Sequence, residues 1–175
     1  DCRVGVLGDL MLDRYIWGAA SRISQEAPVP VVQVRRESAT PGGAANVVRN
    51  LLTLGARALA FGVTGQDRHG QALQALLGEE GADLDGVVTL AERETTVKTR
   101  VIAGSQQVVR IDRESTEPLS PACREEILAR VRRAVDARAI DALILEDYAK
   151  GLLDRELAAE VVSLCARRGV FVTLD

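Results

Sequence analysis

Arg3-Val4-Gly5-Val6-Leu7-Gly8-Asp9 lies near the start of the chain and forms a short apolar run closed by Gly-Asp. A run with no polar face is typical of a central strand in a parallel sheet. Beyond it, similar runs alternate with segments whose apolar residues recur every three or four positions. Such alternation with short connections predicts an α/β fold, a doubly wound and mostly parallel sheet. The further predicted strands are 58–64, 140–145 and 170–174, and the predicted helices are 44–54, 68–77, 121–138 and 154–168.

Residues typical of helix ends support three of these boundaries. Gly55 and Gly169 directly follow two of the helical patterns and are expected to end them. Ser120 is expected to cap the third helix, with Pro121 in its first turn. The chain stops just after the last predicted strand, and we expect it to be the front portion of a larger α/β domain.

Two segments have a different, β-rich pattern. Residues 29–34 contain Pro30, which favours an edge strand. Residues 95–102 and 106–112 alternate around Ala103-Gly104-Ser105, a pattern typical of a hairpin. We therefore expect a small β-sheet lid built from 14–40 and 91–113. The α/β body would comprise 1–13, 41–90 and 114–175.

The composition excludes several classes of protein. The chain has 175 residues, of which 47% are hydrophobic and 27% charged, with a net charge of −3. This balance fits one globular domain or part of one, and excludes a disordered chain or a disulfide-stapled miniprotein. No apolar stretch is long enough for a membrane span, and a pI near 5.3 disfavours nucleic-acid binding. The three cysteines have no CxxC spacing, so we expect reduced thiols and a cytoplasmic location.

The basic residues are unevenly distributed between the two types. Of 22 Lys and Arg residues only two are lysines, Lys98 and Lys150. Lysine is a compact point charge and arginine a rigid fork, so a site can require one and exclude the other. Chance remains the alternative explanation.

Polar or small residues cluster where the predicted strands end. In a doubly wound sheet, ligands bind beyond the carboxyl ends of the strands. Several acids together at one edge favour a polar site, although any single acid there is also a common helix cap. The residues concerned are Asp9, Asp13, Gly65, Asp67, Glu146, Asp147 and Asp175.

Pro41-Gly42-Gly43-Ala44-Ala45-Asn46 precedes and enters a predicted helix. Its small residues allow close approach of a ligand to backbone N–H groups and to the helix N-terminus, which favours hydroxyls or anions. A simple turn before a helix is the alternative. The sequence contains neither GxGxxG nor GxxxxGK[ST], so neither a dinucleotide fingerprint nor a Walker loop is present.

Several motifs in order resemble the ribokinase-like carbohydrate kinases of the phosphofructokinase-B type, and within them the kinases of D-glycero-β-D-manno-heptose 7-phosphate. The resemblance covers essentially the whole chain, and both lysines lie within its motifs. The matching segments are GDLMLDRY (8–15), SRISQEAPVP (21–30), PGGAAN (41–46), TTVKTR (95–100), Gln106-Gln107, Arg110-Ile111-Asp112 and DYAKG (147–151).

This resemblance implies roles for ten residues. Asp13 would bind sugar hydroxyls, and Gly42, Gly43 and Asn46 would line the sugar site. Cations on the lid would bind the 7-phosphate, since a phosphate dianion requires fixed positive charge; a solvated strand face is the alternative. The phosphate candidates are Lys98, Arg100 and Arg110, and further substrate-binding candidates are Gln107, Asp147 and Lys150.

The resemblance also implies the reaction, an ATP- and Mg²⁺-dependent phosphorylation of the sugar C1 hydroxyl in ADP-heptose synthesis for lipopolysaccharide. The family's catalytic base, an Asp in a Gly-Ala-Gly-Asp motif, is expected downstream of Asp175, so residues 1–175 alone should be inactive. Two alternatives remain, a kinase of another sugar or nucleoside and a non-catalytic sugar-binding or dimerisation module.

We also expect a homodimer through the lid, which would otherwise expose strand edges and an apolar face. The apolar residues expected on that face are Ile16, Trp17, Val32 and Val34.

Overall fold

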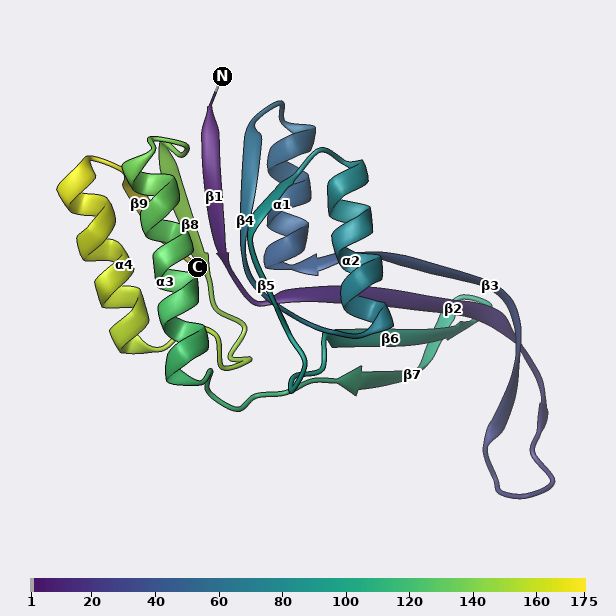
Figure 1. The fold of residues 1–175 in the computed structure, drawn as a ribbon. Helices are drawn as coiled ribbons and strands as arrows, with labels where there is room; N and C mark the ends of the chain where they lie inside the picture. Colours follow the sequence, from purple (N-terminus) through teal and green to yellow (C-terminus); the bar gives the residue numbers. More distant parts are fainter. Residues whose placement is uncertain (1) are drawn as a thin grey trace.

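The computed structural model describes residues 2–175 and contains a five-stranded sheet in which every strand pairing is parallel. The strand order is β5-β4-β1-β8-β9, with β1 at the centre (Figure 1). This arrangement confirms the predicted doubly wound α/β body. Its strands are β1 (Arg3–Gly8), β4 (Arg57–Gly65), β5 (Asp83–Leu90), β8 (Ala142–Glu146) and β9 (Phe171–Leu174).

Helices cover both faces of this sheet, as the apolar periodicity predicted. One buried cluster joins the first two helices to β1 and β4 through residues such as Val6 and Leu73. A second cluster joins the other two helices to the opposite face through residues such as Leu7 and Ile127. The helices are α1 (Ala44–Thr53), α2 (Arg68–Glu79), α3 (Pro121–Asp136) and α4 (Arg155–Arg168).

A second, four-stranded sheet has the order β3-β2-β6-β7. Its two inner strands, β2 and β6, run parallel, and each forms an antiparallel pair with its outer neighbour. The sheet begins at Leu10, only one residue after β1, and ends its second strand at Gly43, so it includes 10–13 and 41–43, segments that the sequence analysis assigned to the body. The strands are β2 (Leu10–Ile23), β3 (Pro30–Gly43), β6 (Thr96–Ala103) and β7 (Gln106–Arg113).

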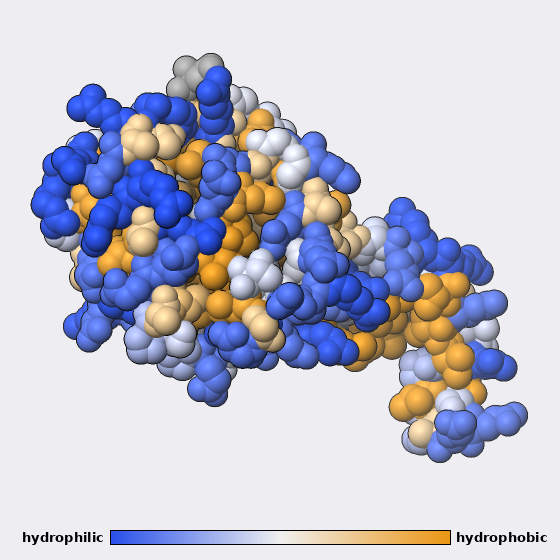
Figure 2. Space-filling view, in the orientation of Figure 1, coloured by the Kyte–Doolittle hydropathy of each residue, from blue (hydrophilic) through white to orange (hydrophobic). Residues whose placement is uncertain are grey.

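The base of the second sheet is packed against the body. Leu10, Leu12 and Val97 are buried in the same cluster as Leu73 and Leu77 of α2. At the other end, the β2–β3 hairpin projects away from the body (Figure 1), and hydrophobic side chains are visible on it in Figure 2. The second sheet is therefore packed against the body at its base and solvent-exposed at its tip.

The apolar face expected for the dimer needs one correction. Ile16 and Trp17 are consecutive residues of β2, paired regularly with Glu37 and Arg36. Because successive side chains of a strand point to opposite faces, Ile16 and Trp17 cannot share one face.

Within residues 2–175, no helix is long and apolar enough to cross a membrane.

Candidate functional site

The site is located where the order of the main sheet reverses. From β1 the chain proceeds to β4 and β5 on one side and later to β8 and β9 on the other. The crevice at such a point, beyond the carboxyl ends of the strands, is where open α/β sheets bind ligands. Asp9 directly follows β1, and the second sheet begins at the next residue. The two sheets are therefore joined at the carboxyl end of β1.

Asp9 supports the loop that follows β8. Asp9 is 4% exposed, and its carboxylate accepts hydrogen bonds from the backbone N–H groups of Tyr148 (2.9 Å) and Lys150 (3.1 Å). Burial raises the pKa of Asp9, against the opposing effect of these two hydrogen bonds. Asp9 thus fixes the backbone of 148–150, and with it the position from which the Lys150 side chain extends.

Asp67, another acid predicted at a strand end, caps a helix. Its Oδ1 accepts the N–H groups of His69 and Gly70 at the start of α2, and its Oδ2 accepts that of Thr95 at 2.8 Å. Partial burial raises the pKa of Asp67, but the hydrogen bonds from Thr95, Gly70 and His69 outweigh it and hold the pKa below its ordinary value. Asp67 therefore joins α2 to the segment that enters β6.

Asp13 lies on β2 facing β6. Its Oδ1 accepts a hydrogen bond from Arg100 Nη1 at 2.5 Å, and the Arg100 guanidinium lies over the Tyr15 ring, 5.4 Å from its centroid. This hydrogen bond raises the pKa of Arg100. A Cβ atom at Gly42 would lie 2.5 Å from Asp13 Oδ2, so glycine is required for the carboxylate to lie there. Asp13 and Gly42 are thus in contact across the β2–β3 pair.

Gly43 and Asn46 lie at the start of α1. Gly43 is the N-cap residue with a φ of 54°, a left-handed conformation that glycine adopts without strain. Asn46 Oδ1 accepts a hydrogen bond from Arg49 Nη2 at 2.7 Å, and Arg49 also donates to Thr40, the register partner of Asp13. These contacts place the glycine-rich segment and Asn46 beside the strands that carry Asp13.

Lys98 and Lys150 converge on one acid. Lys98 lies on β6 and Lys150 in the loop after β8, yet both Nζ atoms approach Glu114 Oε2, at 3.7 Å and 2.9 Å. Lys98 Nζ also lies 3.4 Å from Asp112 Oδ2. Asp13, Lys98 and Asp112 are register partners on three adjacent strands, so they form a row across the second sheet. The row continues through Glu114 to Lys150 of the body.

Neighbouring cations lower the pKa of these two acids, Glu114 and Asp112. The pKa of Glu114 is lowered mainly by its hydrogen bond with Lys150, and further by the charges of Lys150 and Lys98. Desolvation raises the pKa of Asp112, but the hydrogen bond from Arg110 and the charge of Lys98 outweigh it and lower the pKa. Both acids are therefore ionised at neutral pH, and the row is a network of opposite charges.

The other candidate residues lie at different distances from this row. Arg110 joins it, because its Nε donates to Asp112 Oδ1 at 3.0 Å. Gln107 pairs with Ile102 next to the hairpin turn and lines a separate hollow with residues of the β2–β3 hairpin. Asp147 is exposed, and its Oδ1 accepts the N–H of Ala149 at 2.8 Å. The candidate cations of the site, Lys98, Arg100, Arg110 and Lys150, thus all contact residues of the row. Gln107 lies apart from the row, and Asp147 lies in a local turn.

Sequence reasoning did not identify Glu114 or Arg93 as part of the site. Arg93 donates to the backbone oxygens of Ser115 and Glu117, each at 2.9 Å, and to that of Lys150. It therefore ties the segment after β7 to the loop after β8. The rarity of lysine marked Lys98 and Lys150, but no pattern in the sequence pointed to Glu114.

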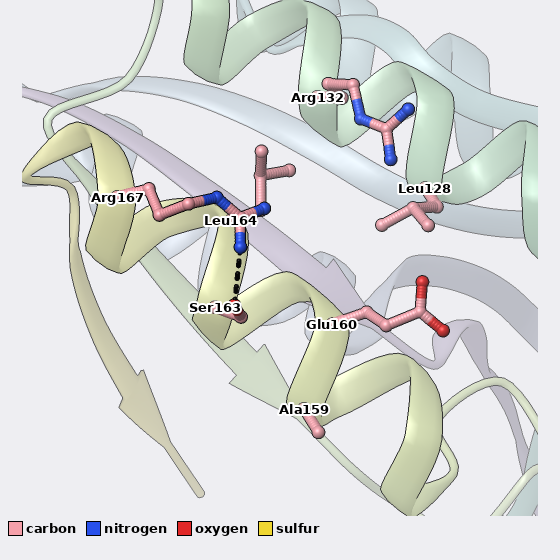
Figure 3. Close-up of a pocket in the computed structure, with 7 residues that line it drawn as sticks. All are labelled: Leu128, Arg132, Ala159, Glu160, Ser163, Leu164 and Arg167. Carbon is pink, nitrogen blue, oxygen red and sulfur yellow. Dashed lines mark hydrogen bonds between the residues drawn. The ribbon is translucent and has the colours of Figure 1, made fainter.

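A different hollow lies between α3 and α4 (Figure 3). Leu128 and Leu164 form its apolar part, and Arg167 donates to Ser163 Oγ at 2.6 Å within it. None of the ten candidate residues lines it.

Among residues 2–175, no group of three or more His, Cys, Asp or Glu side chains is arranged to hold a metal ion. We therefore assign no magnesium ligand here.

The two-sheet architecture is that of a defined class of protein. The model of the pfkB family of carbohydrate kinases matches residues 3–172, and the chain belongs to that family. The chain is similar to the bifunctional protein HldE of Sulfurimonas denitrificans, with 44% identity over 173 residues, which is 99% of this chain and 36% of that protein. For the bifunctional protein HldE of Helicobacter pylori (strain J99) the identity is 41% over 173 residues, covering 99% and 37%. This chain thus spans about a third of the length of these curated relatives.

Solved structures of the same fold are more distant in sequence. A phosphofructokinase-2 from Escherichia coli in complex with substrates and products superposes with a TM-score of 0.74 at 19% identity, covering 100% of this chain and 54% of that one. A ribokinase from Arabidopsis thaliana complexed with ribose and ATP gives 0.69 at 19%, covering 99% and 53%. These likenesses establish the ribokinase-like fold.

Proposed function

We propose that the protein to which this chain belongs transfers a phosphoryl group from ATP to the C1 hydroxyl of D-glycero-β-D-manno-heptose 7-phosphate, a step of ADP-heptose synthesis. The family is one of carbohydrate kinases, and kinase membership implies the use of ATP. The motif resemblance to heptose 7-phosphate kinases and the 44% identity to a bifunctional HldE protein support the choice of sugar.

The observation that carries the proposal is the row that joins Asp13 to the two lysines. A sugar phosphate needs an acceptor for its hydroxyls and fixed cations for its phosphate, and the row places a carboxylate and two ammonium groups near one another. Asp13 would accept hydrogen bonds from the sugar, next to Gly42 and the start of α1. Lys98 and Lys150 would bind the 7-phosphate.

Arg100 and Arg110 have a secondary role in this proposal. Each donates to an aspartate, Asp13 or Asp112, at 3.0 Å or less. Arg100 would orient Asp13, and Arg110 would orient Asp112 beside Lys98. Phosphoryl transfer depends largely on such positioning and on charge stabilisation. Mg²⁺ would supply further charge neutralisation at the transferred phosphate, through ligands that we do not assign to this chain.

The test uses the protein expressed from its complete reading frame, supplied with ATP and Mg²⁺. We expect ATP consumption with heptose 7-phosphate, and ³¹P NMR should show a new phosphate at C1 while the 7-phosphate persists. Fructose 6-phosphate and ribose serve as comparison substrates. Efficient turnover of either one, without turnover of heptose 7-phosphate, would show that the protein is a kinase of another sugar.

A homodimer through the second sheet and a cytoplasmic location complete the proposal. Val34, Val109 and Ile111 on the two outer strands are 50%, 46% and 53% exposed, and these strands carry the open edges of the sheet. The free thiols of Cys2, Cys123 and Cys165 support a reducing compartment.

Sedimentation of the complete protein tests the homodimer. We expect a dimer at micromolar concentration that dissociates in Ile111→Asp. A monomer in the wild-type protein would contradict the proposed assembly.

A further inference from the structure

Both lysines of the chain lie near the same oxygen atom. Glu114 Oε2 is 2.9 Å from Lys150 Nζ and 3.7 Å from Lys98 Nζ. Lys98 belongs to the second sheet and Lys150 to the body, whereas Glu114 directly follows β7. A single carboxylate therefore holds together two ammonium groups from separate parts of the fold.

These ammonium groups are held in a defined place. The side chains of Lys98 and Lys150 are only 18% and 16% exposed. The backbone of Lys150 is fixed on both sides, because Asp9 accepts its N–H and Arg93 donates to its carbonyl oxygen. An anion that replaced the Glu114 carboxylate would therefore find two cations already in position.

Charge favours such a replacement. The arginines of the row are each hydrogen-bonded to an aspartate at 3.0 Å or less, whereas Lys98 contacts Asp112 and Glu114 only at 3.4 Å and 3.7 Å. A carboxylate offers one negative charge and two oxygens, and a phosphate group offers up to two charges and three oxygens. A phosphate that entered would therefore attract the two lysines more strongly than Glu114 does.

We propose that Glu114 is the resident counter-anion of the substrate's phosphate site, which holds Lys98 and Lys150 together until a phosphate group displaces its carboxylate. This inference rests on the proposed function, because that function supplies the phosphorylated sugar. It adds a residue that competes with the phosphate. Glu114 keeps the two lysines paired in the empty site and weakens the capture of free phosphate.

The test measures binding of inorganic phosphate to the complete protein by calorimetry in a phosphate-free buffer, so no turnover is needed. Glu114→Gln keeps a hydrogen-bond acceptor but removes the competing charge. We expect its dissociation constant for phosphate to fall at least threefold. Glu117→Gln is the matched control, because Glu117 is exposed in the same segment and makes no side-chain ion pair in the described residues. It should leave the constant unchanged.

Either of two results would overturn the inference. One is an unchanged or weaker phosphate affinity in folded Glu114→Gln. The other is an unchanged affinity in Lys150→Met, a variant that should bind phosphate at least threefold more weakly whether or not Glu114→Gln folds. If phosphate binding changes as expected but heptose 7-phosphate is not a substrate, the counter-anion role stands and the proposed sugar is wrong.

Discussion

Asp13 forms its ion pair with Arg100, at 2.5 Å between Oδ1 and Nη1, rather than with Lys98, its register partner on the same neighbouring strand. The arginine at the more distant position thus neutralises the acid, while the lysine beside it turns to Asp112 and Glu114. The proposed hydroxyl acceptor and the proposed phosphate cation Lys98 thus have different ion-pair partners, although they are neighbours.

Asp13→Ala should weaken the binding of heptose 7-phosphate at least tenfold. The substitution removes the acceptor for sugar hydroxyls, and each polar group left unpaired in a closed site costs about 1–3 kcal/mol. Calorimetry with the complete protein measures the affinity. Glu125→Ala, at an exposed position of α3, is the control. A change of less than threefold in Asp13→Ala would show that Asp13 serves only its pair with Arg100.

Gly42→Ala should reduce sugar binding with little effect on folding. The new methyl group would lie 2.5 Å from Asp13 Oδ2, and this carboxylate can move while the backbone stays in place. We expect a raised KM for heptose 7-phosphate and an unchanged far-UV circular dichroism spectrum. Gly78→Ala on α2, where the added atom lies 3.9 Å from its nearest neighbour, should leave KM unaltered. Equal KM values in both variants would disprove the contact.

Lys98→Ala should raise KM for heptose 7-phosphate roughly tenfold or more, since a charge-assisted contact contributes about 1.5–3 kcal/mol. It should hardly affect the same sugar without its phosphate. Lys98→Arg should restore only part of the loss, because a planar fork cannot occupy the same point. Steady-state kinetics with the paired sugars decides the matter. Equal losses on both sugars would instead place Lys98 near the transferred phosphate of ATP.

The Asp67 cap should open in acid. Its pKa in the folded protein is below the ordinary value of 3.8, so its charge stabilises the fold above that value. This stabilisation is lost as the pH falls from about 3.8 through the lower folded pKa. Hydrogen exchange at His69, Gly70 and Thr95, corrected for intrinsic rates, should therefore accelerate below pH 3.8.

Asp67→Asn provides the comparison for this pH effect. Asparagine still caps a helix but carries no charge, so the extra protection in the wild-type protein should vanish in acid. A difference between the two proteins that does not depend on pH would contradict the role of the charge.

The body of the fold was predictable because each of its helices and most of its strands contain a local pattern. Ser120 and Gly169 occupy the cap positions that the sequence predicted. β5 was not predicted, since Asp83, Asp85 and Gly86 interrupt its apolar pattern. The predicted second sheet began at residue 14, whereas β2 of that sheet begins at Leu10. Leu10 and Leu12 are apolar and buried, as residues of the body are, although they lie in a strand of the second sheet.

The site was only partly predictable. Lys98 and Lys150 could be singled out by their rarity, and Asp13 and Gly42 by their motifs. Glu114 could not, because its importance arises from a contact between residues that the fold brings together from β6, from the end of β7 and from the loop after β8. Such contacts depend on the packing of the two sheets and leave no periodic pattern in the sequence.

The pairing of β2 with β6 has a consequence for the order in which the molecule assembles. Met11 pairs with Thr96, and the whole of α1, β4, α2 and β5 lies between them in the chain. Pairing of β2 with β3 and of β6 with β7 involves only nearby segments, so each hairpin can form early. Joining the hairpins requires closure of a long loop, whose entropic cost falls once the intervening segment is compact. The row in which Asp13 and Lys98 lie side by side is therefore expected to be completed late in folding.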